Sequence, residues 1–281
     1  MSQPKLKFAA RSHAGLVREL NEDAVLAQSP CFLVADGVGG WDAGDRASQA
    51  ALQAFEPLLG RVPALEEFRD CYVRAQQAVK AVGASNENGS GSTLAGVVLV
   101  DLPEQGYHWL VCNIGDSRVY HFAAGQLQQV TLDHTLRDEM LAAGMEIDSA
   151  ELPGAHIITK ALGTPDDTCD TWLLPLETGD RLLVCSDGVT VVLDDELLVD
   201  FLAGADAEET ADDILAAVLQ GGAPDNVSLI VVDVVRGAQA ADDEAAAMRA
   251  ETADLTGNAV PAETAENSES APELGEKGSL S

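Results

Sequence analysis

Two Asp-Gly pairs, each closing an apolar run, are the residues of this sequence best suited to chemistry. The pairs are Asp36-Gly37 and Asp187-Gly188. Short apolar runs of this kind are typical of buried strands, so each pair places a carboxylate where a strand ends. Two further acidic segments, Asn21-Glu22-Asp23 and Pro224-Asp225-Asn226, lie beside other apolar runs. Four distant segments therefore each offer an acid at a strand end, where a fold could bring them together.

Carboxylates that share one site repel one another, which raises their pKa values or forces them apart. A hard divalent cation with oxygen ligands removes this repulsion. None of the four acidic segments contains a histidine, so Mg²⁺ or Mn²⁺ is favoured over Zn²⁺. The sequence therefore predicts a metallohydrolase.

Each acidic pair also has a simpler interpretation, because Asp-Gly and Asp-Asn are common turn dipeptides. The glycines after Asp36 also suggest a dinucleotide-binding loop. Asp42, however, occupies the place of the third glycine of that motif, and Asp36 would face the pyrophosphate. The combination of four acidic segments favours the metal site.

Composition restricts the remaining function classes. The chain has 281 residues, is 46% hydrophobic, and carries a net charge of -31, which argues against a nucleic-acid partner. Its five cysteines include no C-x-x-C spacing and are expected to be reduced core residues. The N-terminus has no signal-peptide pattern, and no apolar run approaches the length of a membrane span. We expect a cytoplasmic protein without a membrane span.

Charge and composition divide the chain near residue 236. Residues 237–281 carry ten acids against two basic residues, within Ala, Ser, Thr and Pro. Such a segment cannot bury enough apolar surface to offset its ordering entropy, so we expect a folded domain over 1–236 and a disordered acidic tail over 237–281. The tail is either a solvating extension or an autoinhibitory arm that competes for the metal site.

The periodicity of the folded part predicts helices and antiparallel strands without regular βαβ alternation, which indicates an α+β fold. Four consecutive strands between 93 and 131 read as an antiparallel meander. The expected helices are Ala47–Leu59, Leu65–Ala84, Asp195–Phe201 and Glu208–Leu219, and the expected later strands are Arg181–Ser186 and Val227–Val235.

Eight segments taken together resemble the type 2C metal-dependent protein serine/threonine phosphatases, in their bacterial branch. The resemblance covers about residues 8–235. The segments, in the order of that family, are 15–24, 35–40 with 44–48, 91–93, 113–120, 131–135, 159–163, 179–188 and 224–228.

The resemblance implies a four-layer αββα sandwich, in which two antiparallel sheets are flanked by helices, with 1–236 as the catalytic domain. It implies two or three Mn²⁺ or Mg²⁺ ions, and hydrolysis of protein phosphoserine and phosphothreonine by a hydroxide that a binuclear centre activates. The expected partners are Ser/Thr-phosphorylated proteins, the targets of a bacterial Ser/Thr kinase, and the expected oligomeric state is a monomer.

The resemblance also assigns roles to single residues. Asp36 bridges two ions and Gly37 lends its carbonyl. Asp23 and Glu22 hold one ion, directly or through water, and Asp187 and Asp225 hold the other. Asp116 holds a weaker third ion or forms a hairpin turn. Arg18 binds the substrate phosphate or is a surface charge paired with Glu19 or Glu22.

Two residues, Val38 and Lys160, depart from the family pattern, and His134 and the segment 138–155 have their own interpretations. Val38 stands where many eukaryotic members have a proposed acid histidine, and valine cannot donate a proton. His134 is expected to be structural, Lys160 stands where arginine is frequent, and 138–155 matches a mobile flap. Two alternatives to a protein phosphatase remain, a two-metal phosphatase of small phosphoesters and a non-catalytic module with this fold.

Overall fold

The computed structural model describes residues 3–38, 43–84, 89–144, 153–154 and 157–237. Its strands are β1 (Lys5–His13), β2 (Asp23–Gln28), β3 (Cys31–Val38), β4 (Gly91–Ser92), β5 (Leu94–Leu102), β6 (Gly106–Ile114), β7 (Arg118–Ala123), β8 (Gln126–Gln129), β9 (Asp170–Pro175), β10 (Arg181–Cys185) and β11 (Val227–Arg236). Its helices are α1 (Gly44–Gln53), the short 3-10 helix η1 (Glu56–Leu58), α2 (Leu65–Ala84), α3 (Leu136–Ala142), α4 (Asp187–Thr190), α5 (Asp195–Leu202) and α6 (Ala207–Gln220).

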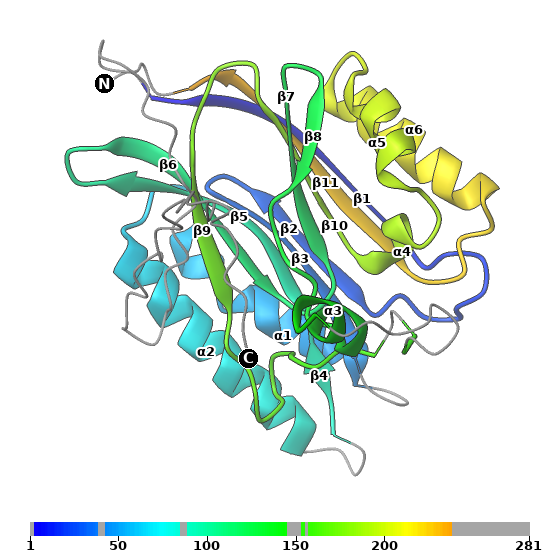
Figure 1. The fold of residues 1–281 in the computed structure, drawn as a ribbon. Coiled ribbons are helices and arrows are strands. Elements are labelled where there is room, and N and C mark those ends of the chain that lie inside the picture. Colours follow the sequence, from blue (N-terminus) through cyan, green and yellow to red (C-terminus); the bar gives the residue numbers. More distant parts are fainter. Residues whose placement is uncertain (1–2, 39–42, 85–88, 145–152, 155–156, 238–281) are drawn as a thin grey trace, which may run out of the picture.

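The strands form two antiparallel sheets. One sheet has the order β1-β11-β10-β7-β8, and the other has the order β2-β3-β5-β6-β9, with β4 paired to β3. Figure 1 shows α1 and α2 on one side of the molecule and α4, α5 and α6 on the other. The expected α+β sandwich of two antiparallel sheets with flanking helices is confirmed.

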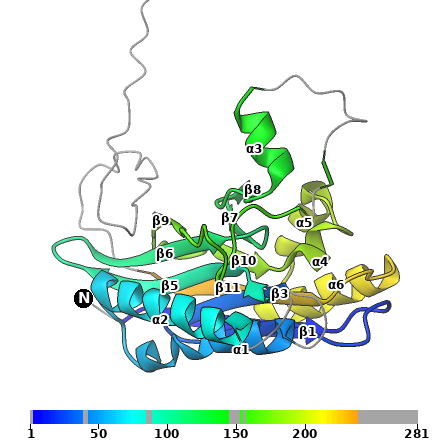
Figure 2. The same ribbon diagram turned by 90° about the horizontal axis from the view of Figure 1, so that it is seen from below.

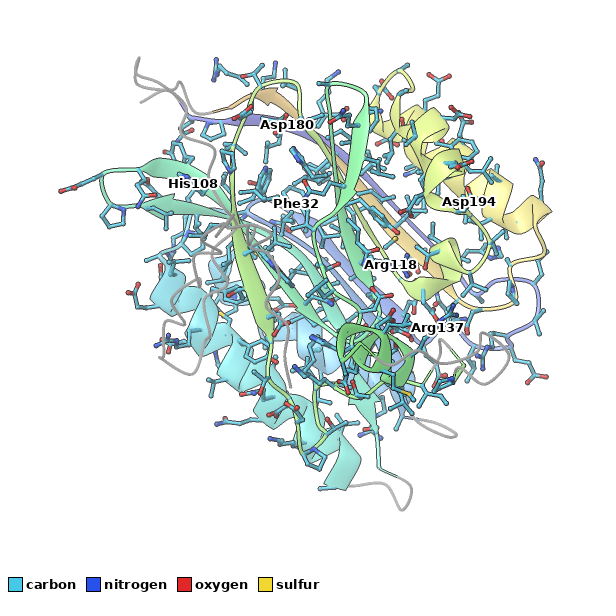
Figure 3. The ribbon with its side chains drawn as sticks, viewed as in Figure 1. Phe32, His108, Arg118, Arg137, Asp180 and Asp194 are labelled. Carbon is cyan, nitrogen blue, oxygen red and sulfur yellow. The ribbon has the colours of Figure 1, made fainter. Side chains whose placement is uncertain are left out.

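Apolar cores lie between each sheet and the helices that cover it, and also between the two sheets. Helix α2 places Phe68, Tyr72 and Val79 on its buried face, at the spacing of an amphipathic helix that covers a sheet. Between the sheets, Phe32 meets Trp109 edge to face, with 6.0 Å between the ring centroids. Figure 3 shows Phe32 in this interior. Burying an aromatic side chain of this size contributes about 2 to 3 kcal/mol to stability.

The meander predicted between 93 and 131 is wrong in its middle. β5 pairs with β6 and β7 pairs with β8, but β6 and β7 belong to different sheets. The chain changes sheets at Gly115, whose φ of +106° is a left-handed conformation that favours glycine. β6 instead pairs with β9, a strand that the sequence analysis did not predict.

The helix predicted over Ala47–Leu59 ends early. α1 stops at Gln53 and is followed by η1, which contains Pro57. Proline has no backbone N–H and clashes with the preceding helical turn, so a continuous helix cannot pass through this position. The helix predicted over Leu65–Ala84 matches α2 at both ends.

Helix α3 overlaps the start of the segment 138–155, which was expected to match a mobile flap. Thr135 caps it by accepting a hydrogen bond from the Asp138 amide, at 3.1 Å. None of its side chains is buried, and Figure 2 shows it projecting from the sandwich. Residues 145–152 of that segment lie outside the described residues.

Two further expectations concern the ends of the chain and the membrane. The acidic tail lies outside the described residues apart from Gly237, so its disorder stays a prediction. Among the helices of the described residues, none has the length and apolar character needed to cross a bilayer.

Candidate metal centre

A pocket of about 280 Å³ lies at the end of the sandwich where Figure 1 shows α3 and α4. Seven of the eight predicted site residues line it, and the eighth, Asp23, is the cross-strand partner of Asp36. The lining residues are Arg18, Glu22, Asp36, Gly37, Val38, Asp116, Ile158, Asp187, Asp225 and Asn226. Segments more than 150 residues apart in sequence therefore meet at one site.

The pairing of β2 with β3 brings the first two acids together. Asp23 and Asp36 are direct cross-strand partners, an arrangement in which like charges destabilise a sheet. Asp23 is 8% exposed, and its Oδ2 accepts a hydrogen bond of 2.9 Å from Ser186 Oγ in the other sheet. Its Oδ1 is buried and has no hydrogen-bond partner among the described residues.

Asp187 reaches the site because α4 begins directly after β10. Gly188 allows this approach, since a Cβ there would lie 1.8 Å from the backbone oxygen of Asn226. Asp187 Oδ1 is buried and also has no partner among the described residues. Asp36 and Asp187 line the same pocket, so their carboxylates face one another across it.

Burial and mutual repulsion raise the pKa values of the clustered acids. Burial, and then the nearby charges of Asp23 and Asp187, raise the pKa of Asp36 well above its ordinary value. Burial raises the pKa of Asp23 to about 6, and burial followed by the charge of Asp187 raises that of Asp116 to about 7. Burial followed by the charge of Asp225 raises the pKa of Asp187. These carboxyls lie where the ionised form is costly unless a cation is present.

The Asn226 side chain holds the loop that carries Arg18 and Glu22. Its Nδ2 donates to the carbonyl oxygens of Ala14 and Leu20, at 2.9 and 2.8 Å, and its Oδ1 accepts from the Glu22 amide at 2.8 Å. Three bonds from a 6% exposed amide fix the loop against the segment that follows Asp225. Arg18 Nη2 then donates to Asp225 Oδ2 at 2.8 Å.

Gly37 occupies a position that admits no side chain. A Cβ there would lie 2.2 Å from the carbonyl oxygen of Gly44 and 2.7 Å from that of Glu22. The Gly37 amide donates to the same Glu22 oxygen at 3.2 Å. The start of α1, the end of β3 and the Glu22 segment therefore meet at this glycine.

His134 holds the loop that carries Asp116, a role that the sequence analysis left as an unspecified structural one. Its Nδ1 accepts from the Gly115 amide at 3.1 Å, and its own amide donates to the Gly115 oxygen at 2.9 Å. Nδ1 is thus unprotonated, so Nε2 carries the proton and donates to Asp170 Oδ2 at 3.2 Å. The spacing of 19 residues between His134 and Gly115 gave no sequence signal for this contact.

The donor set fits a hard divalent cation. Its side-chain donors are carboxylate oxygens, the buried oxygens of Asp23 and Asp187 lack partners, and no histidine lines the pocket. Within the described ranges, however, no three His, Cys, Asp or Glu side chains already stand in a ready-made cation cage. Small movements of the carboxylates, in exchange for relief of their repulsion, would accompany ion binding.

Comparisons with known proteins place these observations in one family. The model of the protein phosphatase 2C family matches residues 12–221. The serine/threonine protein phosphatase PstP of Mycobacterium tuberculosis is 34% identical over 237 residues, which cover 82% of this chain and 45% of PstP. The chain thus matches about half the length of that relative. The serine/threonine phosphatase stp of Listeria welshimeri is 31% identical over 241 residues, covering 79% of this chain and 94% of stp.

A solved structure agrees with both relatives. The catalytic domain of PstP in complex with two manganese ions superposes with a TM-score of 0.72 at 33% identity, and the match covers 82% of this chain and 99% of that one. The family model matches more than half of the chain, and the 31% identity to stp extends over most of both chains; these two findings establish the family. The chain belongs to the protein phosphatase 2C family.

Proposed function

We propose that this chain hydrolyses phosphoserine and phosphothreonine in proteins with the help of Mn²⁺ or Mg²⁺. The observation that carries the proposal is that acids from five segments meet in one pocket beside Arg18. The relatives named as serine/threonine phosphatases and the manganese complex of one of them support it. Residues 1–236 form the catalytic domain in this proposal, and the whole activity resides there.

Asp36 and the Gly37 carbonyl would hold the ions together with four further acids. Asp23 and Glu22 would hold one ion, directly or through water, and Asp187 and Asp225 would hold a second. Asp116, almost buried and facing the charge of Asp187, would hold a third. Bound divalent ions of this kind lower the pKa of water toward neutrality and neutralise the charge of a phosphoryl group.

Arg18 would bind the phosphate oxygens of the substrate. A guanidinium carries five N–H donors in a planar fork, so its bond to Asp225 leaves donors free to face the pocket. The ion pair also orients the side chain, because Asp225 lines the same pocket as Arg18. The rate gain from Arg18 comes from positioning the phosphate and stabilising its charge.

The leaving oxygen would receive its proton from solvent. Val38 lines the pocket and cannot donate a proton, and none of the pocket-lining residues is a histidine. His134 is 5% exposed and engages both ring nitrogens in the Gly115 and Asp170 contacts. No histidine-dependent acidic limb is therefore expected in the pH profile of the rate.

A phosphatase of small phosphoesters would use the same ions and the same arginine, so it is the second candidate. The substrates in the main proposal are proteins phosphorylated on Ser or Thr by a kinase of the same cell. Phosphate release from a phosphothreonine peptide and from sugar phosphates separates the two candidates. Preference for the sugar phosphates would reject the protein-phosphatase proposal.

The direct test measures Mn²⁺-dependent phosphate release from a phosphothreonine peptide by the full chain, with Asp36→Asn and Asp187→Asn as variants. Each variant is expected to lose at least about 100-fold in kcat, because it removes a carboxylate from between or beside the ions. Calorimetric titration with Mn²⁺ supplies a second readout, in which both variants bind more weakly. Asp101→Asn, an exposed acid at the end of β5, is the control for the change in charge.

A further inference from the structure

Three of the most exposed apolar side chains of the described residues lie in the loop that carries Arg18 to the candidate metal centre. Five large apolar side chains are more than 60% exposed, namely Leu16, Val17, Leu20, Leu132 and Val191. Three of them flank Arg18 within two residues, and Val191 follows the short helix α4 that begins at Asp187. Clustered apolar exposure on a soluble surface marks an interaction site more often than single exposed residues do.

The chain holds this apolar group on a fixed support. The Leu16 amide donates to the Ala223 oxygen at 2.9 Å, and the Leu20 carbonyl accepts from Asn226 Nδ2 at 2.8 Å. A Cβ on Gly15 would lie 2.1 Å from the backbone oxygen of Asp225, so the loop is pressed against that segment. Since the backbone is held in this way, the loop cannot bury its apolar side chains by a local rearrangement without losing these bonds.

Val191 lies next in sequence to Val192, which packs near Gly221 in the segment 221–223. A Cβ on Gly221 would lie 2.3 Å from Cγ1 of Val192, while Ala223 receives the amide bond from Leu16. The segment that carries Val191 and the loop that carries Leu16 therefore both contact residues 221–223. We call Leu16, Val17, Leu20 and Val191 the apolar rim.

The surroundings of the apolar rim are acidic. The two stretches that carry it, 14–22 and 187–196, contain one basic residue, Arg18, and six acids, namely Glu19, Glu22, Asp187, Asp194, Asp195 and Glu196. Glu19, Asp194, Asp195 and Glu196 are exposed. Figure 3 shows Asp194 on the side of the molecule that carries α5. With a net charge of -31, the chain attracts basic partners and repels acidic ones.

We propose that the apolar rim contacts the substrate and selects phosphorylated segments with apolar residues next to the phosphoamino acid and basic residues further out. This inference rests on the proposed function, because Arg18 at the centre of the rim must hold the phosphate. An apolar side chain beside the phosphoamino acid would lie against Leu16, Val17 or Leu20, while Lys or Arg further along would face the acids around them. A small phosphoester has no flanking residues, so in this proposal its hydrolysis would not depend on the rim.

The test compares three phosphothreonine peptides with p-nitrophenyl phosphate, using the full chain with Mn²⁺. The first peptide has Leu and Val beside the phosphothreonine and Lys at the outer positions. The second replaces Leu and Val by Ser, and the third replaces Lys by Glu. The protein variants are the double variant Val17→Ser, Leu20→Ser and, as a matched control, Val73→Ser, whose side chain is 42% exposed on α2.

The first peptide is expected to exceed the second by about tenfold in kcat/KM, the effect of partly burying one or two apolar side chains. For each protein, kcat/KM for a peptide is divided by kcat/KM for p-nitrophenyl phosphate. By this ratio the double variant is expected to lose most of the preference for the first peptide, and Val73→Ser is expected to retain the preference. The third peptide is expected to be slower than the first, by a factor that shrinks as salt is raised. Both differences would support the apolar rim.

Equal kcat/KM for the first two peptides, or an advantage that survives in the double variant, would overturn the apolar selection and leave the phosphatase proposal intact. Equal rates for the first and third peptides would overturn the basic preference. Hydrolysis of p-nitrophenyl phosphate without hydrolysis of any peptide would overturn the protein-phosphatase proposal, and the rim with it. The three failures are thus distinguishable from one another.

Discussion

Replacing Asp116 by Asn is expected to stabilise the protein when divalent ions are removed. Asp116 is 9% exposed, and burial followed by the charge of Asp187 raises its pKa from 3.8 to about 7. A folded-state pKa above the unfolded value means that the folded protein binds more protons between those two values. The free energy of unfolding therefore falls as pH rises through 7, and asparagine removes this dependence.

The size of the effect follows from the pKa difference. A rise from 3.8 to about 7 corresponds to a cost of about 4 kcal/mol once Asp116 is ionised in the folded protein, near pH 8. At pH 5 the folded carboxyl is protonated, and the cost is less than half as large. For a domain of this size, about 4 kcal/mol shifts Tm by about 8 to 16 °C.

The assay is thermal unfolding of the wild type and Asp116→Asn in EDTA, at pH 5 and pH 8. Asp116→Asn is expected to have the higher Tm at pH 8 and a much smaller advantage at pH 5. Asp101→Asn removes the same charge from an exposed position and serves as the control. Added Mn²⁺ is expected to raise the Tm of the wild type more than that of Asp116→Asn.

The reasoning would be refuted if Asp116→Asn and Asp101→Asn showed the same change of Tm between the two pH values. That result would mean that Asp116 feels no more repulsion in the folded protein than an exposed acid does. The carboxylates would then be separate from one another, and the candidate metal centre would lose its physical basis.

Three further predictions concern the groups around the acids. Arg18→Lys is expected to lower kcat/KM for a phosphopeptide by about tenfold or more, because lysine keeps the charge but loses the guanidinium fork, and steady-state kinetics at saturating Mn²⁺ measure this. His134→Phe is expected to lower stability by about 1 to 3 kcal/mol in urea unfolding, because the buried Gly115 amide loses its acceptor. His134→Asn, whose Oδ1 can accept the same bond, is expected to lose less. Gly188→Ala is expected to weaken Mn²⁺ binding by calorimetry, since its Cβ would lie 1.8 Å from the Asn226 oxygen and would push α4 away.

Much of the fold could be read from the sequence, because each amphipathic pattern reports which face of an element is buried. Helix α2 agrees with its predicted bounds, and the apolar runs at β3 and β10 are strands. The pattern does not say which sheet a strand joins. β6 and β7 are both apolar and separated by a short turn, so they looked like a hairpin, whereas the conformation of Gly115 sends them into different sheets.

The acids of the candidate site could be predicted, but the groups that hold them could not. Carboxylates after apolar runs are visible in sequence, and all of those predicted line the pocket except Asp23, which pairs with Asp36. Asn226 and His134 act through hydrogen bonds to backbone groups of remote segments. A backbone group looks the same at every position in a sequence, so such contacts leave no pattern to recognise.

The supporting groups explain how the folded chain can hold a cluster of acids before any ion binds. Asn226 and His134 fix the two loops that carry site acids by uncharged hydrogen bonds, which stay in place when the carboxylates ionise. Gly37 and Gly188 remove the side chains that would keep the segments apart. The site carboxylates therefore stay close together and repel one another in the metal-free fold. A bound cation removes this repulsion, and its removal contributes to the free energy of metal binding. A substitution at Asn226 or His134 should consequently lower metal affinity although neither side chain is a proposed ligand.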